Sequence, residues 1–495
     1  MLSREKLKKI VDTGTMLMTE TDKERLLDLL INQVMEITAC DAATLYLWRD
    51  EGLMFARMKT RSLHISRGEG GEHIDLPPVS FDEKNVCAYA AMHRELINVA
   101  DVYESGGFDF SGPKEYDALT GYRTQSMLVI PLEDTRGDVI GVLQLMNAMD
   151  ADGAVAPFHK DDEYVIRALG SQTAVSVNNM LYMDELKDQL YSFVSAFVTS
   201  VDARTPYNGS HTRKVAVYAG LIADWINRMH KAGDCEDYFD ENRREQLVLA
   251  AALHDIGKMV IPLSVMNKAT KLGGRLRDIE KRFQLLAAYG EIDMLRGQMT
   301  EEENGYLQTY LVDSLDFLRE VDRAGYLTEE QLARVREIAA KTYRRGDEII
   351  PYLTRDEEEC LLVRRGTLTD AERERMESHV VMTEKILDQV HFGRHYANVA
   401  RFAVAHHELL DGSGYPRHKK ADELELEMRI LAVADIYDAL VATDRPYKKP
   451  LPQEKAFSIL YSMVEEGKLD GRLVTYLEDA LYEISDEELA KRQMF

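Results

Sequence analysis

Apolar and polar residues follow two different periods along this 495-residue chain. Between Leu26 and Ile37 the apolar residues recur with the spacing of one helix face. Short runs in which alternate residues are apolar follow, such as ATLYLW, SMLVIPL and VIGVLQLMN, and glycine and aspartate separate them as turn residues do. The pattern predicts an N-terminal helix over residues 1–20 and, over residues 21–165, an antiparallel sheet flanked by helices.

Residues 166–203 are predicted to form one long connecting helix, because they contain no proline and Gly170 as their single glycine. Side chains three and four residues apart form one line along it: Leu169, Gln172, Ser176, Asn179, Met183, Leu186, Leu190, Phe193 and Phe197. A parallel two-stranded coiled coil has this heptad pattern. A packing stripe within one domain gives nearly the same pattern. A homodimer is the preferred interpretation.

Residues 204–470 are predicted to be almost wholly helical, and the acidic segment 471–495 to form a further helix. The predicted fold class is therefore α+β, in which a long helix joins an N-terminal α/β domain to an all-α bundle. The net charge of −25 repels phosphates, so neither nucleic acid nor a membrane is the expected partner. Without a signal-peptide pattern or a long apolar run, the chain is expected to be soluble and cytoplasmic.

Histidines and acids in the helical half lie in apolar helices or at their ends. The helix EQLVLAAALHDIGK carries apolar residues up to His254 and Asp255. Five more residues share this setting: His211, His379, His406, His407 and Asp435. One metal ion takes about four to six ligands, so this set exceeds one ion and favours two metals bridged by a carboxylate and a water. Such a pair suits phosphoester hydrolysis, although a buried His–Asp dyad alone is more often structural.

The same half resembles the HD-GYP branch of the HD phosphohydrolases. The segment HHELLDGSGYP fits that family's loop, and SHTRKVAVYA, HDIGKMVIPLSVMNK, ESHVVMTEKIL and ADIYDALVATDRPYKK follow in the family's order. The resemblance implies that the seven residues above bind two divalent metals, iron or manganese, with Asp255 bridging. It also implies hydrolysis of cyclic di-GMP to pGpG or GMP by a metal-bridging hydroxide. Lys258 would contact phosphate or protonate the leaving oxygen.

The resemblance also implies which residues contact the substrate. Gly414, Tyr415 and Pro416 form the substrate-facing part of the loop, and Tyr415 can stack on or bond to a guanine or its phosphate. Arg445 and Lys448 resemble residues that hold the second phosphate, although VATDRPY is one residue longer than the family spacing. A third metal needs a glutamate four residues before His211. Tyr207 stands there, which favours two metals.

The N-terminal half resembles a GAF domain, with RTQSMLVIPLEDTRGDVIGVLQLMNA as its last hairpin. Asn147, Phe158, Asp162 and Glu163 match the signature of members that bind cyclic nucleotides. Ala148 stands where that signature has lysine, so this residue of the signature does not carry over to this chain. The resemblance implies a sensor domain that binds an unknown small molecule or only dimerises.

The helical half also contains an insertion, residues 271–366, that the usual HD-GYP domain lacks. It is either a surface decoration or a lid or dimer arm, and we favour the second. For the whole chain, the preferred hypothesis is a cyclic di-GMP phosphodiesterase controlled by the GAF domain. The alternatives are a catalytically weak cyclic dinucleotide receptor or scaffold, or hydrolysis of a mixed GMP-AMP ring or a nucleotide polyphosphate.

Overall fold

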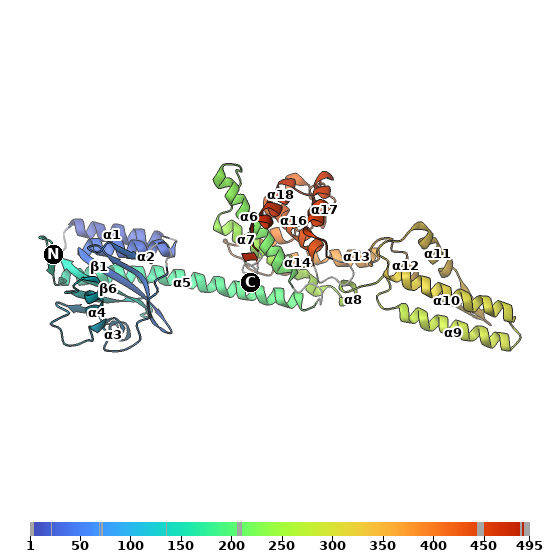
Figure 1. The fold of residues 1–495 in the computed structure, drawn as a ribbon, viewed down its shortest axis with the longest axis horizontal. Coiled ribbons are helices and arrows are strands. Elements are labelled where there is room, and N and C mark those ends of the chain that lie inside the picture. The colour runs from blue at the N-terminus through green and yellow to red at the C-terminus, as the bar shows by residue number, and fades with distance from the viewer. Residues whose placement is uncertain are drawn as a thin grey trace. The chain divides into compact units, whose positions relative to one another are not determined.

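The computed structural model describes residues 4–20, 22–68, 70, 73–134, 136–204, 210–442, 450–485 and 488–489. They form two compact units, Met1–Gln189 and Leu190–Phe495. Helix α5 (Lys160–Asp202) continues from the first unit into the second (Figure 1). It begins before the predicted start at residue 166, because the acidic residues 161–163 suit the first turn of a helix. Among the described residues, none of the helices has an apolar stretch that could span a bilayer.

The first unit is built on one antiparallel sheet with the strand order β3-β2-β1-β6-β5-β4 and a short β7 beside β6. The strands are β1 (Cys40–Arg49), β2 (Gly52–Thr60), β3 (Ile65–Arg67), β4 (Ile97–Val99), β5 (Met127–Glu133), β6 (Val139–Met149) and β7 (Val155–Ala156). The helices before α5 are α1 (Arg4–Thr19), α2 (Lys23–Thr38), α3 (Val86–His93) and α4 (Ser111–Thr120).

Alternation along β5 determines which helices cover which face of this sheet. Leu128, Ile130 and Leu132 belong to the core that includes α2 and the start of α5. Met127 and Val129 point the other way, into the core that includes α3. Because both faces are buried, β5 is apolar at nearly every position. The expected antiparallel sheet flanked by helices is therefore confirmed.

The second unit contains a helical bundle with its own core. Its helices are α6 (His211–Ala232), α7 (Glu241–Leu253), η2 (Ile256–Val260), α8 (Leu263–Met266), α13 (Asp370–Glu377), α14 (His379–Leu387), α15 (Val399–Ala403), η3 (Ala421–Glu423), α16 (Leu426–Val441), α17 (Gln453–Glu465) and α18 (Gly471–Glu483). Helix α6 packs against α7, α16 and α18 around buried residues such as Ile222, Leu249 and Leu431. The predicted α+β fold class is confirmed.

The insertion forms a separate core inside the second unit. Its elements are α9 (Leu276–Leu295), α10 (Glu301–Arg323), α11 (Glu329–Ala339), β8 (Thr342–Arg345), β9 (Glu348–Pro351) and α12 (Arg355–Leu361). Helices α9 and α10 lie side by side (Figure 1). Capping boxes at Thr300, Thr328 and Thr354 begin α10, α11 and α12.

The hairpin of β8 and β9 corrects the prediction that residues 204–470 are almost wholly helical. Gly346 has φ +59° at its turn, a conformation that glycine adopts without strain. Ile349 and Ile350 follow after Asp347 and Glu348 and favour a strand. The sequence GDEII therefore outweighs the helical pattern around it.

The two ends of the insertion are fastened together by a buried lysine. Lys271 has 0% exposure, and its Nζ donates to the carbonyl oxygens of Val363 (2.7 Å) and Gly366 (2.6 Å). Lys268 Nζ, also buried, pairs with Glu372 at 2.5 Å. These bonds fix the base of the insertion to the segments before α9 and after α12. The proposed role as a lid or dimer arm stays a prediction.

Candidate metal centre

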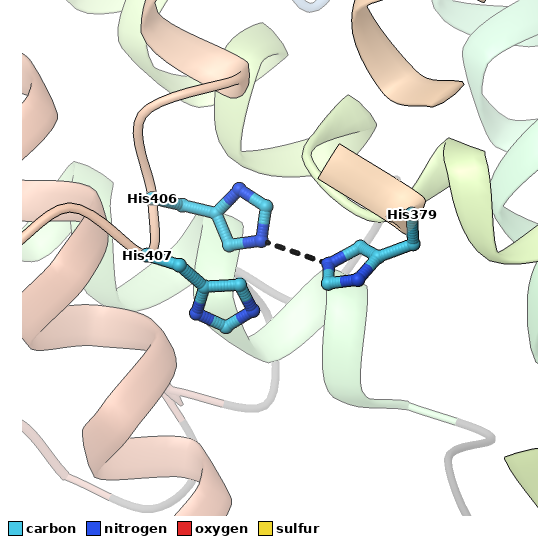
Figure 2. Close-up of side chains that lie close together, drawn as sticks. All are labelled: His379, His406 and His407. Carbon is cyan, nitrogen blue, oxygen red and sulfur yellow. Dashed lines mark hydrogen bonds between the residues drawn. The ribbon is translucent and has the colours of Figure 1, made fainter. Parts of the chain in front are cut away.

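All seven residues expected to bind metal lie in one cluster. His211 begins α6, His254 and Asp255 follow α7, and Asp435 lies in α16. The other three are His379, which begins α14, and His406 and His407, which follow α15. Two groups of ligand atoms are close enough to hold an ion: His211, His254 and Asp255, and His379, His406 and His407. Figure 2 shows the second group, in which Nε2 of His379 lies 3.4 Å from Nε2 of His406.

Asp255 lies between the two groups and faces each with a different oxygen. Its Oδ2 is 3.5 Å from Nε2 of His211 and 3.2 Å from Nε2 of His254. Its Oδ1 is 3.4 Å from Nε2 of His379 and 3.9 Å from Nε2 of His406. A carboxylate in this position can bridge two cations.

Asp435 is a second carboxylate that faces both groups. Its Oδ1 lies 3.1 Å from Nε2 of His211, and its Oδ2 lies 3.5 Å from Nδ1 of His407. It comes from α16, whereas Asp255 follows α7, so two separate elements supply the negative charge.

Two buried atoms without hydrogen bonds indicate that the cluster fits a cation. Among the described residues, Nε2 of His254 and Oδ1 of Asp255 are buried and have no hydrogen-bond partner. A buried polar atom without a partner costs about 1–3 kcal/mol. Since both atoms point into the cluster and both are metal-ligand types, a divalent cation would satisfy them. The residues present therefore fit bound metal.

Backbone carbonyls orient three of the histidines. Nδ1 of His254 lies 2.6 Å from the carbonyl oxygen of Ala251, and Nδ1 of His379 lies 2.7 Å from that of Met376. Nδ1 of His406 has the same relation to the carbonyl three residues before it, at 2.7 Å. An N–H at Nδ1 that donates to the carbonyl leaves Nε2 free of a proton for a ligand bond.

His211 is oriented by a carboxylate instead, that of Asp438, and sequence reasoning missed Asp438. Nδ1 of His211 donates to Oδ2 of Asp438 at 2.6 Å, and Asp438 is 1% exposed. Asp438 follows Asp435 by one helical turn in ADIYDAL, so the D-x-x-D spacing was the available signal. A carboxylate behind a ligating histidine fixes the ring and raises its basicity.

The protonation states of Asp255, His379 and His406 suit metal binding. Burial raises the pKa of Asp255, but the neighbouring His254 and Lys258 outweigh it and hold that pKa well below its usual value. Burial lowers the pKa of His379 to about 4, and it also lowers the pKa of His406 well below the usual value. Ionised carboxylates and neutral imidazoles are the forms that bind divalent metals.

Lys258 and His407 lie at the more exposed side of the cluster, which we call its opening. Their side chains are 19% and 24% exposed, whereas that of Asp255 is 3% exposed. Nζ of Lys258 lies 2.5 Å from Oδ2 of Asp255. The ring of Tyr415 lies 4.7 Å from the ring of His407, so Tyr415 borders the opening. A substrate can reach the centre past these three side chains.

The loop residues expected to face the substrate lie beside this opening. A Cβ on Gly414 would lie 2.4 Å from the backbone nitrogen of Leu409 and 2.5 Å from the carbonyl oxygen of His407. Only glycine therefore lets the loop return so close to the helix end, which brings Tyr415 and Pro416 to it. Arg445 and Lys448 lie outside the described residues, and so does Tyr207.

The first unit contains a separate cavity of about 300 Å³ between the sheet and the segments around α3 and α4. Most of its lining is apolar, including Phe55, Met58 and Met146. Lys59 also lines it, and the amine of Lys59 donates to Oδ1 of Asn32 at 2.6 Å. Gln144 accepts a hydrogen bond from the hydroxyl of Tyr46 at 2.9 Å. These polar groups are therefore already engaged within the protein.

The signature residues of the first unit hold its backbone together. Oδ1 of Asn147 accepts from the backbone nitrogen of Gln125 at 2.7 Å, and its Nδ2 donates to the carbonyl oxygen of Arg123 at 2.8 Å. Asn98 Nδ2 donates to Glu163 at 2.8 Å and to the carbonyl oxygen of Phe158 at 3.1 Å. These contacts are structural.

Comparison with protein families identifies both units. The family model for the GAF domain matches residues 22–177. Two family models for the HD domain match residues 208–339 and 358–473. The gap between the two HD matches lies in the insertion and contains β8 and β9.

Curated relatives are similar to part of this chain. The chain is 39% identical over 128 residues to the 3′3′-cGAMP-specific phosphodiesterase 3 of Vibrio cholerae, covering 26% of this chain and 27% of that protein. It is 34% identical over 222 residues to the cyclic di-GMP phosphodiesterase response regulator RpfG of Xanthomonas campestris pv. campestris, covering 43% and 55%. A cyclic di-GMP phosphodiesterase of Thermotoga maritima is 41% identical over 109 residues, covering 22% and 28%. The chain thus spans at most about half the length of these relatives. It combines an N-terminal match to the GAF domain with C-terminal matches to the HD domain.

Proposed function

We propose that this protein hydrolyses cyclic di-GMP to pGpG, GMP or both, with two divalent metals, iron or manganese, in the cluster. The observation that carries the proposal is Asp255, which faces two histidine groups and has a buried oxygen without a hydrogen bond. When bound there, two cations would acidify a water between them and neutralise charge on a phosphoryl group. Of the three relatives described above, the one aligned over the most residues is named a cyclic di-GMP phosphodiesterase.

The residues at the opening then protonate the leaving oxygen and contact the substrate. Hydrolysis adds water at phosphorus and breaks the bond to the ribose oxygen, which must take up a proton. The ammonium of Lys258 lies 2.5 Å from Asp255, on the exposed rim. It can donate to a phosphoryl oxygen or to the leaving oxygen. Tyr415 borders the same opening and offers a ring face to a base.

The test is turnover by the purified full chain. Metals are counted by mass spectrometry, and the protein is incubated with cyclic di-GMP, with the mixed GMP-AMP ring and with a nucleotide polyphosphate while chromatography follows the products. We expect pGpG or GMP from the first substrate, and no product from a His407→Ala control. Metal-loaded protein that binds the nucleotides and leaves all of them intact would instead establish a receptor or scaffold.

We also propose that α5 forms the interface of a homodimer. Leu169, at the start of the expected line, is 0% exposed and belongs to the core of the first unit, so the line begins later than the sequence suggested. From there on, Met183 is 61% exposed, Leu186 59% and Phe193 65%. Exposed apolar residues at heptad spacing on one helix fit a second copy of the same helix.

Charges in this line are expected to break the dimer. The double variant Leu186→Lys, Phe193→Lys should elute as a monomer and scatter light with half the wild-type mass, because two ammonium groups would have to be buried in the seam. Ser192→Lys places one such charge outside the line and should leave the mass unchanged. A wild-type protein that is already monomeric at micromolar concentration contradicts the proposal.

For the GAF domain, we propose a neutral, largely apolar small ligand that regulates the HD domain. The cavity has a mostly apolar lining, and Lys59, one of its lining residues, uses its amine to bond Asn32. A cyclic nucleotide would need an unengaged donor for its phosphate. Cyclic GMP and cyclic AMP at millimolar concentration are therefore expected to leave the melting temperature unchanged. A rise of several degrees with either nucleotide would contradict this ligand class.

A further inference from the structure

Glu408 is the acidic residue of HHELLDGSGYP that follows the two histidines. It is 2% exposed and lines the wall of a cavity of about 250 Å³ together with Arg417 and Lys419. A buried carboxylate needs strong partners. Its Oε1 accepts the backbone N–H of Arg417 at 2.7 Å, and its Oε2 accepts the backbone N–H of Lys419 at 2.9 Å. Glu408 thus holds two backbone groups just past the GYP segment.

The other end of the loop is held by bonds within the loop itself. Oδ1 of Asp411 accepts the backbone N–H of Ser413 at 2.9 Å and its hydroxyl at 2.6 Å. The backbone N–H of Tyr415 donates to the carbonyl oxygen of His407 at 3.1 Å. With the entry fixed by Asp411 and the exit fixed by Glu408, the loop is closed against the helix end that carries the histidines.

The closed loop determines where Tyr415 lies. Its ring is tilted by 36° over the ring of His407, with 4.7 Å between the centroids. Only Pro416 separates Tyr415 from Arg417, whose backbone N–H Glu408 holds, so the chain has little freedom between the two. Arg417 does not close the loop with its side chain, which pairs with Glu384 instead.

We propose that Glu408 is a positioning residue that sets substrate specificity. It touches neither the metal ligand atoms nor the reacting atoms, and it acts through the backbone of residues 415–419. This inference rests on the proposed function, because it assigns Tyr415 to the nucleotide rather than to the chemistry. Loss of Glu408 therefore weakens binding of a nucleotide and leaves hydrolysis of a small phosphodiester at the same centre unchanged.

The test compares two substrates in the metal-loaded full chain. Glu408→Gln keeps the shape but offers one acceptor for two N–H donors, so KM for cyclic di-GMP should rise about tenfold. Turnover of bis(4-nitrophenyl) phosphate, which has no nucleobase, and the metal content should stay within about twofold of wild type. Glu384→Gln removes the same charge from the same cavity without touching a backbone bond, and it should leave both substrates unaffected. Equal loss of both activities, or of metal, overturns the proposal.

Amide hydrogen exchange tests the positioning independently of any substrate. In Glu408→Gln, the peptide containing residues 415–420 should exchange at least about tenfold faster than in wild type, because the N–H groups of Arg417 and Lys419 lose their shared acceptor. Unchanged exchange overturns the role of Glu408. A wild-type protein inert toward cyclic di-GMP would refute the proposed function alone, since the exchange rate still decides whether Glu408 holds the loop.

Discussion

Replacement of Asp255 by asparagine is expected to remove both metals and to lower turnover of cyclic di-GMP by at least about a thousandfold. The reason is its place between the two histidine groups. One oxygen faces His211 and His254, and the other faces His379 and His406. An amide nitrogen in place of either oxygen carries no lone pair for a metal and removes the negative charge that would bridge two cations.

The measurement is metal content per chain by mass spectrometry, together with kcat at saturating substrate. Asp388→Asn is a matched control, because Asp388 is an exposed acid of the same unit outside the cluster. It should keep full metal content and turnover. Two metals per chain in Asp255→Asn, with turnover within about tenfold of wild type, would show that Asp255 is no bridging ligand.

Replacement of Lys258 by methionine is expected to lower kcat by about a hundredfold or more and to leave the metals bound. Lys258 lies at the opening, with its Nζ 2.5 Å from Asp255, and its side chain is 19% exposed. An ammonium group there is positioned to meet charge that develops on a phosphoryl or leaving oxygen. Methionine keeps the length of the side chain and removes its donors.

The test measures kcat and metal content together for each variant of Lys258. Lys258→Arg retains the charge but not the compact ammonium, so it should recover part of the lost rate. A fall in kcat that goes together with loss of metal would assign Lys258 to holding Asp255 in place. An unchanged kcat would remove it from the reaction altogether.

Local features of the sequence were sufficient for most of the fold. Alternating apolar residues in SMLVIPL gave a strand, and the packing of Leu128 and Met127 into opposite cores follows from that alternation. The helix EQLVLAAALHDIGK ends where the apolar stripe ends, with His254 and Asp255 after its last turn. The prediction of helix was wrong at GDEII, where a turn glycine and two isoleucines form a hairpin between helices.

The sequence by itself determined the residue types of the centre and the elements that carry them, because periodicity and motif spacing are local properties. Only the tertiary structure decided that Asp438 lies behind His211, 227 residues away in the sequence. It also decided that Asp255 faces two histidine groups and that Glu408 holds the loop beyond Pro416. Such pairings depend on how distant helices pack against one another, and no pattern along the chain records that packing.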